Sequence, residues 1–258
     1  SYILDKLRVA WYLDYSSEMS DIPTNYKKLP YISADDPSNL LSESAIESMV
    51  QDAPAGSYWY IGGEPNKGPG YVAPAAFVDV FHYYFTEIRK HDSQAKIMSP
   101  SVLNWWFTCF GCTGFQTGRD WVDAFISLYE AKYGEKPPVA AWNIDLYPID
   151  WRGWQERSAG RDPGELLPND DWELMKGQIT GGTWDLLALG GPSQRYFVAS
   201  TPVTYEGMRT YLDGQGYQDT PIWITEMAVH WGYDDIVATL PPGPAGNYRW
   251  DDLSVFLN

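Results

Sequence analysis

The feature that most constrains the fold of this chain is a repeated alternation between short apolar runs and segments with helical periodicity. Apolar runs of strand length, such as Ser57–Gly62 and Pro221–Thr225, are separated by polar or Gly/Pro-rich stretches and by helical patterns such as Val72–Lys90. This alternation is typical of βα units arranged around a parallel sheet. The sequence therefore predicts an α/β fold. Its 258 residues fit a single (β/α)8 TIM barrel domain, which typically needs about 250 residues.

The positions of the elements follow from the spacing of apolar residues and from the residues at the ends of each run. Strands are expected at Leu7–Tyr12, Leu29–Ile32, Ser57–Gly62, Lys96–Val102, Val139–Tyr147 and Pro221–Thr225, with a further one around Tyr196–Ala199. Helices are expected at Ser42–Val50, Val72–Lys90, Trp121–Tyr133, Trp172–Ile179 and Tyr205–Gln215. This gives about seven strands where a closed barrel needs eight. The barrel is therefore expected to be incomplete at the C-terminus, or to close with a strand beyond Asn258.

Composition narrows the class of partner. The formal net charge is −16, from 34 acidic and 18 basic side chains. Such a surface repels nucleic acid and anionic lipid, so neither is expected as a partner, whereas a neutral substrate is compatible with it. No apolar run approaches the roughly 20 residues of a membrane-spanning helix. Aromatic residues make up 16% of the chain and suit a protein core and a sugar-binding cleft equally well.

The two cysteines, Cys109 and Cys112, lie in the segment F-T-C-F-G-C-T-G. Without a second pair or a nearby His they make a poor zinc site. Gly111 and Gly114 break the helix that a thioredoxin-like motif would open. A disulfide that closes a small loop is the favoured interpretation, and two free thiols are the alternative. Because disulfides persist in oxidising compartments, a secreted, extracellular protein is expected.

Two glutamates directly follow strong predicted strands. Glu64 lies in W-Y-I-G-G-E-P-N, and Glu226 lies in P-I-W-I-T-E-M-A. In α/β barrels the working residues lie at the carboxyl ends of strands, where their side chains share one cleft. Cleavage of a glycosidic bond needs one carboxyl group to protonate the leaving oxygen and a second to act at the anomeric carbon. The pair therefore predicts glycoside hydrolysis, whereas either glutamate alone could be a solvated loop carboxylate.

These segments resemble the motifs of a known group. W-Y-I-G-G-E-P-N is similar to the acid/base motif of clan A glycoside hydrolases, in which Asn-Glu-Pro closes the fourth barrel strand. P-I-W-I-T-E-M-A is similar to that clan's nucleophile motif on the seventh strand, and N-I-D-L-Y-P resembles the His-x-Tyr-Pro segment that ends the sixth strand in families such as 39 and 128. The resemblance implies a (β/α) barrel and a retaining mechanism. It also implies Glu64 as general acid/base, Glu226 as nucleophile, and no metal or cofactor.

Two residues depart from this pattern. Gly63 stands where the family has an Asn that bonds the sugar 2-hydroxyl. Asp145 stands where the family has a His, and it would bring a third carboxylate close to the nucleophile. A nearby like charge raises the pKa of a carboxyl group, so Asp145 is expected to retune the catalytic pair. The chain is therefore expected to be a divergent member of its clan.

Further substrate-binding residues are expected near the same strand ends, where they could stack on a sugar or bond its hydroxyls. They are Trp11, Tyr12, Asp14, Asn66, Asn104, Trp105, Trp106, Asp145, Tyr147 and Trp231. The resemblance implies a bond from Tyr147 to the nucleophile. Structural capping is an equal alternative for Asn66, and core packing is an equal alternative for Trp11 and Trp105.

The sequence thus predicts a monomeric, retaining hydrolase that cleaves β-glycosidic bonds of a neutral polysaccharide or oligosaccharide substrate by double displacement, with endo action. A non-catalytic glycan-binding protein on the same scaffold is the alternative, and Gly63 and Asp145 motivate it. A redox protein that uses Cys109 and Cys112 is a third and more distant interpretation.

Overall fold

The computed structural model describes residues 11–18, 27–67, 71–106, 117–146, 176–188 and 196–227. Its contacts divide the chain into two compact units that interleave along the sequence. Unit 1 comprises Ser1–Val102, Gly114–Ile144 and Asp219–Thr225, and unit 2 comprises Leu103–Thr113, Asp145–Gln218 and Glu226–Asn258.

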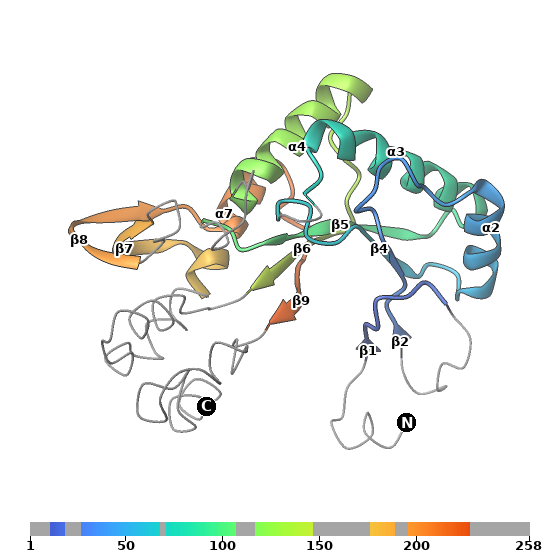
Figure 1. The fold of residues 1–258 in the computed structure, drawn as a ribbon, viewed down its shortest axis with the longest axis horizontal. Helices are drawn as coiled ribbons and strands as arrows, with labels where there is room; N and C mark the ends of the chain where they lie inside the picture. Colours follow the sequence, from blue (N-terminus) through green and yellow to red (C-terminus); the bar gives the residue numbers. More distant parts are fainter. Residues whose placement is uncertain are drawn as a thin grey trace, which may run out of the picture. The chain divides into compact units, whose positions relative to one another are not determined.

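Unit 1 is built on a five-stranded sheet (Figure 1). The strand order is β3 (Tyr31–Ile32), β4 (Tyr58–Ile61), β5 (Lys96–Leu103), β6 (Ala141–Leu146) and β9 (Ile222–Met227). β3 pairs with β4, and β4 with β5, in parallel. Contacts assign the last residues of β5, β6 and β9 to unit 2. A separate parallel pair consists of β1 (Trp11–Tyr12) and β2 (Lys27–Lys28).

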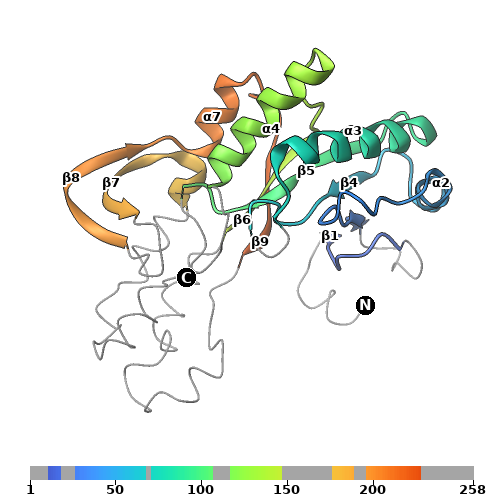
Figure 2. The same cartoon turned by 45° about the horizontal axis from the view of Figure 1, so that its top comes forward.

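Three helices of unit 1 cover one face of this sheet, as Figures 1 and 2 both show: α2 (Glu43–Asp52), α3 (Pro74–His91) and α4 (Gly118–Tyr133). Pro74 opens α3, where its fixed φ and missing N–H cost nothing. The Thr117 side chain caps α4 by accepting a hydrogen bond from the backbone N–H of Asp120 at 3.1 Å. α4 ends at Gly134, whose φ of 77° suits glycine.

An aromatic core lies between α3, α4 and the sheet. Phe77, Phe81 and Phe125 are fully buried. The ring of Phe125 meets those of Phe77 and Phe81 edge to face, at centroid distances of 5.6 and 5.5 Å. Trp142 of β6 adds its ring 6.4 Å from that of Phe125. Full burial of one such side chain stabilises the fold by about 1.5–3 kcal/mol, so this layer holds unit 1 together.

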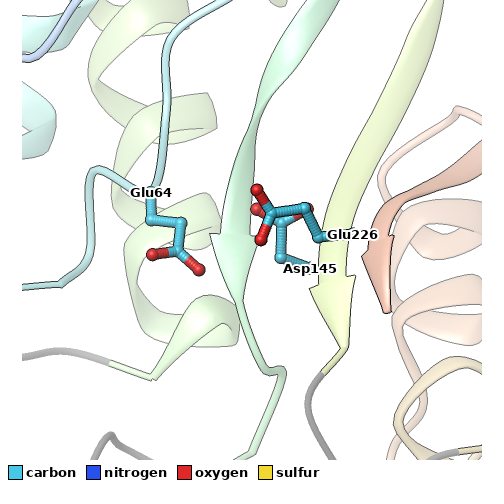
Figure 3. A group of neighbouring side chains, drawn as sticks. All are labelled: Glu64, Asp145 and Glu226. Atoms are coloured by element: carbon cyan, nitrogen blue, oxygen red, sulfur yellow. The ribbon is translucent and has the colours of Figure 1, made fainter. Parts of the chain in front are cut away.

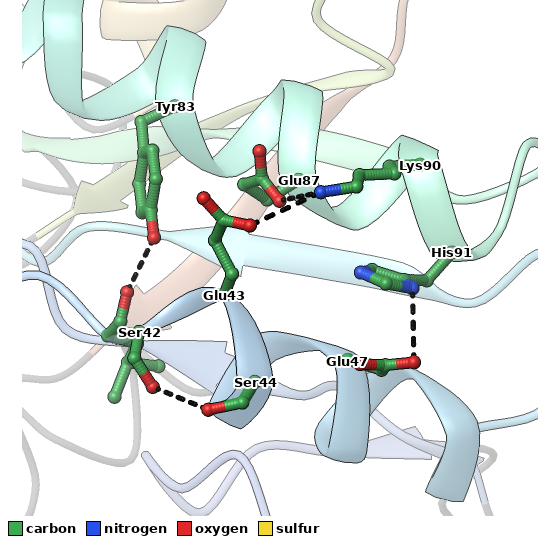
Figure 4. Close-up of polar contacts among 9 residues, drawn as sticks. Ser42, Glu43, Ser44, Glu47, Tyr83, Glu87, Lys90 and His91 are labelled. Atoms are coloured by element: carbon green, nitrogen blue, oxygen red, sulfur yellow. Dashed lines mark hydrogen bonds and ion pairs between the residues drawn. The ribbon is translucent and has the colours of Figure 1, made fainter.

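Polar contacts tie α2 and the segment before it to α3 (Figure 4). The Tyr83 hydroxyl donates to the carbonyl of Leu41 at 2.7 Å, and the backbone N–H of Leu41 donates to the Tyr84 hydroxyl at 3.1 Å. Lys90 donates to Glu43 at 3.3 Å, but this pair is exposed. Exposed ion pairs contribute about 0–1 kcal/mol, so the tyrosine contacts carry most of this attachment.

Unit 2 contains an antiparallel hairpin of β7 (Gly182–Ala188) and β8 (Tyr196–Tyr205), followed by α7 (Met208–Gly214). Only one strand was expected here, around Tyr196–Ala199. Because Tyr205 pairs with Gly182 in the hairpin, the following helix starts at Met208 and not at Tyr205. Residues 176–180 are helical, as expected for the end of Trp172–Ile179.

The predicted α/β fold with parallel strands is confirmed. The expected strands from Leu29–Ile32 to Pro221–Thr225, and the helices from Ser42–Val50 to Trp121–Tyr133, occur with ends shifted by a few residues. Residues 7–10 and the expected loop Trp151–Asn169 lie outside the described residues. No helix among the described residues is long and apolar enough to cross a membrane.

Candidate active site

Glu64 follows β4 closely, in a turn that begins at Gly62. Gly62 has a φ of 133°, and a Cβ at this position would lie 2.6 Å from the Cβ of Pro100. Only glycine fits both the conformation and the space. The backbone N–H of Lys67 donates to the carbonyl of Glu64 at 3.1 Å and closes the turn. The end of β4 is thus fixed by local packing, and it presents Glu64 at the carboxyl edge of the sheet.

The Glu64 carboxylate has a cationic partner. The ammonium of Lys67 lies 2.6 Å from Oε2 of Glu64, and the two side chains are 41% and 17% exposed. A carboxylate in this contact acts as a hydrogen-bond acceptor. Lys67 must therefore release Glu64 before that group can give a proton to a substrate. The neighbouring Asn66 is fully buried, which favours a structural role for its side chain.

Asp145 on β6 and Glu226 on β9 are neighbours in unit 2 (Figure 3). The heads of β5, β6 and β9 point the same way in this view, so both side chains lie near the carboxyl ends of their strands. One carboxylate oxygen of Asp145 lies within 4.8 Å of one of Glu226. The backbone N–H of Asn104, just after β5, donates to the carbonyl of Asp145 at 3.0 Å.

The two acids differ in exposure. Asp145 is 2% exposed, and Glu226 is half-buried. Burial raises the pKa of the Glu226 carboxyl above its usual range, because loss of water disfavours the charged form. Their oxygens are of the kind that Ca²⁺ and Mg²⁺ prefer, but Ca²⁺ takes about six to eight such ligands and Mg²⁺ an octahedral set. The two carboxylates also suit nucleophilic and proton-transfer chemistry.

At the end of β1, the three predicted residues have different surroundings. Trp11 is 39% exposed, and its ring lies 5.2 Å from that of Trp223. Burial, and secondarily the Asp14 carboxylate, raise the pKa of the Tyr12 hydroxyl. The Asp14 carboxylate lies 2.9 Å from the ammonium of Lys28, whose side chain is only 3% exposed. Asp14 therefore serves to neutralise a buried lysine.

The residues that follow β5 are largely inside unit 2. Asn104 and Trp105 are buried. Nε2 of Gln178 donates to Oδ1, the side-chain amide oxygen of Asn104, at 3.3 Å. The indole N–H groups of Trp105 and Trp106 both donate to the carbonyl of Glu206, at 3.1 and 2.8 Å. This burial favours packing for Asn104 and Trp105. Trp106 is half-buried and is the member of this group with ring surface left for a ligand.

Four residues singled out in the sequence lie outside the described residues: Tyr147, Trp231, Cys109 and Cys112.

A cavity of about 450 Å³ in unit 1, at the ends of β1 and β3, was not predicted from the sequence. It is lined by Tyr15, Ser16, Ser17, Glu18, Tyr31, Ile32, Ser33, Asp35, Asp36, Asn39, Leu41 and Tyr84. The strand-end rule that identified Glu64 would have found Asp35, had it been applied to the weaker run Leu29–Ile32.

No protein-family model matches the sequence, and no curated protein matches it. Among solved structures, the chain is similar to a GH128 (subgroup II) endo-β-1,3-glucanase from Pseudomonas viridiflava, with 16% identity, coverage of 93% of this chain and 86% of that chain, and a TM-score of 0.48. A second subgroup II enzyme, from Sorangium cellulosum, gives 16% identity, 93% and 77% coverage, and the same TM-score of 0.48.

A GH128 (subgroup I) endo-β-1,3-glucanase from Amycolatopsis mediterranei, in complex with laminaripentaose, is also similar. It gives 14% identity, 96% and 88% coverage, and a TM-score of 0.39.

Proposed function

We propose that the protein is a retaining glycoside hydrolase that cleaves β-glycosidic bonds of a neutral polysaccharide, with Glu64 as general acid/base and Glu226 as nucleophile. The observation that carries the proposal is the position of these two glutamates after β4 and on β9, strands of the same sheet. Parallel strands present their carboxyl ends at one edge of a sheet, and residues at such strand ends commonly act on one substrate.

Each group has a defined task in the proposed reaction. In the first step the Glu226 carboxylate attacks the anomeric carbon while Glu64 gives its proton to the leaving glycosidic oxygen, and a glycosyl ester forms on Glu226. In the second step Glu64 takes a proton from water, whose oxygen attacks the anomeric carbon and frees Glu226. This double displacement requires carboxyl groups about 5–5.5 Å apart.

Asp145 would act on Glu226 and not on the sugar. It is almost fully buried, beside the proposed nucleophile. Two neighbouring carboxylates favour a shared proton over two negative charges. Asp145 would therefore add to the rise in the pKa of Glu226 that burial causes.

The wider proposals extend the expectations drawn from the sequence. The parallel sheet with helices on one face would be part of a single (β/α)8 barrel domain. We also propose endo action, a monomer and an extracellular location. The cysteine segment that motivates the location lies outside the described residues.

The direct test measures hydrolysis of a panel of neutral polysaccharides. The panel includes a β-1,3-glucan, because the structurally similar enzymes are endo-β-1,3-glucanases. Loss of the acid/base in Glu64→Gln should lower kcat/KM by about 10²–10⁴-fold, and Glu226→Gln should abolish turnover. Proton NMR of the first product should show a retained β-anomer. Exposed Glu130→Gln, on α4, is the matched control. Turnover close to wild type in either active-site variant would overturn the assignment.

A non-catalytic glycan-binding protein is the second candidate. The contact between Lys67 and Glu64, at 2.6 Å, favours it because it holds the proposed acid as an acceptor. This candidate predicts that the wild-type protein binds oligosaccharides of the panel and hydrolyses none. Isothermal titration calorimetry alongside product analysis separates the two functions.

A further inference from the structure

Two tyrosines form part of the wall of the cavity in unit 1. The rings of Tyr15 and Tyr31 meet edge to face, with centroids 5.5 Å apart. Tyr15 is 48% exposed and has a φ of 54°, a left-handed conformation that residues other than glycine rarely adopt. The surrounding structure must hold it there, and such strain is concentrated at binding sites.

A buried lysine supplies that support. The ammonium of Lys28 pairs with Asp14 at 2.9 Å and donates to Oγ of Ser16 at 2.8 Å and to the carbonyl of Glu18 at 2.5 Å. These contacts bracket Tyr15 in sequence, so they fix the loop that carries it. The cavity wall is therefore formed before any ligand arrives, which lowers the entropic cost of binding.

Asp35 stands where this cavity meets the turn of Glu64. Its Oδ2 accepts a hydrogen bond from Oγ of Ser33 at 3.0 Å, and among the described residues no donor bonds its Oδ1. A Cβ placed on Gly63 would lie 2.6 Å from Oδ1 of Asp35 and 3.2 Å from the hydroxyl of Tyr31. The Asp35 carboxylate thus occupies the space that a side chain at position 63 would take. Gly63 directly precedes Glu64, so Asp35 lies beside the turn that carries the proposed acid/base.

The chemistry of the cavity fits a neutral sugar. Its volume, about 450 Å³, lies within the range of small-molecule sites. A carboxylate oxygen accepts hydrogen bonds from hydroxyl groups, and a tyrosine ring can pack against the apolar face of a pyranose. A cation site is less favoured, because Oδ1 of Asp36 already accepts from the backbone N–H and Oγ of Ser38 at 2.9 and 2.6 Å.

We propose that this cavity is a glycan subsite that packs one pyranose unit against the rings of Tyr15 and Tyr31, and that Asp35 accepts a hydrogen bond from a hydroxyl of that unit, close to the turn that carries Glu64. The proposal rests on the proposed function for the identity of the ligand. It also explains why a glycine stands at position 63. A residue without a side chain lets Asp35, which comes from the loop after β3, supply a polar group to this space.

The first test compares Asp35→Ala with Asp52→Ala, which removes an exposed carboxylate from the end of α2, outside the cavity. Loss of a charged hydrogen bond should raise KM for a cleaved oligosaccharide by about 10-fold or more, with a smaller change in kcat. Asp52→Ala should keep wild-type KM. Equal KM values for the two variants would overturn the proposal while leaving the catalytic assignment of Glu64 and Glu226 intact.

The second test uses Gly63→Ala. The added methyl group should push the flexible, exposed Asp35 side chain aside and raise KM about as much as Asp35→Ala does. In the double variant Gly63→Ala/Asp35→Ala the two effects should not add, because both remove the same contact. Additive effects would show that Gly63 and Asp35 act separately, which contradicts the proposal.

The third test separates this subsite from catalysis. Calorimetric binding of laminaripentaose, cellopentaose and xylopentaose is measured in a Glu226→Gln background, with and without Asp35→Ala. A loss of affinity on adding Asp35→Ala supports the subsite even if the wild-type protein hydrolyses nothing. No binding of any oligosaccharide overturns both proposals. An effect of Asp35→Ala on Ca²⁺ affinity alone, with glycan affinity unchanged, would identify a cation site and overturn the subsite.

Discussion

The helix-covered face of the sheet and its carboxyl edge are built from different kinds of residue. On the covered face, Phe77, Phe81 and Phe125 are fully buried and interlock as edge-to-face rings. At the carboxyl edge, Glu226 is half-buried with a raised pKa, and in the loop after β1 Tyr15 is exposed in a left-handed conformation. The first arrangement lowers the free energy of the folded state, and the second raises it locally. Most of the stability therefore comes from one part of the molecule, and the proposed function depends on another.

The largest effect is expected on the covered face. Phe81→Ala should lower the free energy of unfolding by about 3–5 kcal/mol, because it removes a fully buried ring and leaves a cavity. Leu128→Ala, at a 41% exposed position on α4, should change it by less than about 0.5 kcal/mol. Urea denaturation followed by circular dichroism measures both. If both variants lost the same stability, the covered face would not be the source of stability that we infer.

A smaller effect is expected where the two regions meet, at the end of β4. Gly62→Ala adds a methyl group 2.6 Å from the Cβ of Pro100 at a φ of 133°, so it combines overpacking with backbone strain. We expect a loss of about 3 kcal/mol, together with a fall in kcat from the displaced Glu64. Gly134→Ala has a φ of 77° but nothing within 4 Å, so it should lose only about 1 kcal/mol. Comparable losses in the two variants would mean that Pro100 can move away.

The smallest effect on stability is expected at Glu226, where the substitution should stabilise the protein and not destabilise it. Its folded-state pKa is raised above the ordinary 4.5, so the protein loses stability as the pH rises through the window between the unfolded and folded values. Glu226→Gln removes that loss. The variant should be more stable than wild type at pH 7 and equal to it below about pH 4. Thermal unfolding across this pH range measures the difference.

The same shift has a kinetic counterpart. A nucleophilic carboxylate must be ionised, so the acidic limb of kcat/KM in the wild-type enzyme should lie above pH 4.5, the ordinary pKa of a glutamic acid. A limb at or below that value would mean that Glu226 is not the nucleophile.

The covered face could be predicted from the sequence because its signals are local. Phe77, Phe81, Tyr84 and Ile88 recur at helical spacing, and all four are buried on α3. Gly134 was expected to end α4 and does so. The hairpin of β7 and β8 was not predicted as such, because its pairing joins residues as distant as Gly182 and Tyr205. Sequence periodicity reports which side of an element is apolar, and it does not report which element pairs with it.

The carboxyl edge was predictable only in outline. Working residues of α/β folds are expected at the carboxyl ends of strands, and this expectation placed Glu64 and Glu226 correctly relative to β4 and β9. It could not show that Lys28 engages Asp14, or that Asp35 approaches Gly63, because these contacts join segments far apart in the sequence. Nor could it show that Trp105 is fully buried. A tryptophan after a strand looks the same in the sequence whether it faces a ligand or a helix.

The two hydrogen bonds at Leu41 have a consequence for engineering this protein. Consecutive tyrosines of α3 hold both polar groups of one residue that also lines the cavity: Tyr83 binds its carbonyl, and Tyr84 binds its N–H. One side of the cavity is thereby fastened to the helix layer. Substitutions that shift α3, even at positions remote from any ligand, would change the shape of the proposed subsite. Directed evolution of substrate preference should therefore find useful variants among the core contacts of α3 as well as among the residues that line the cavity.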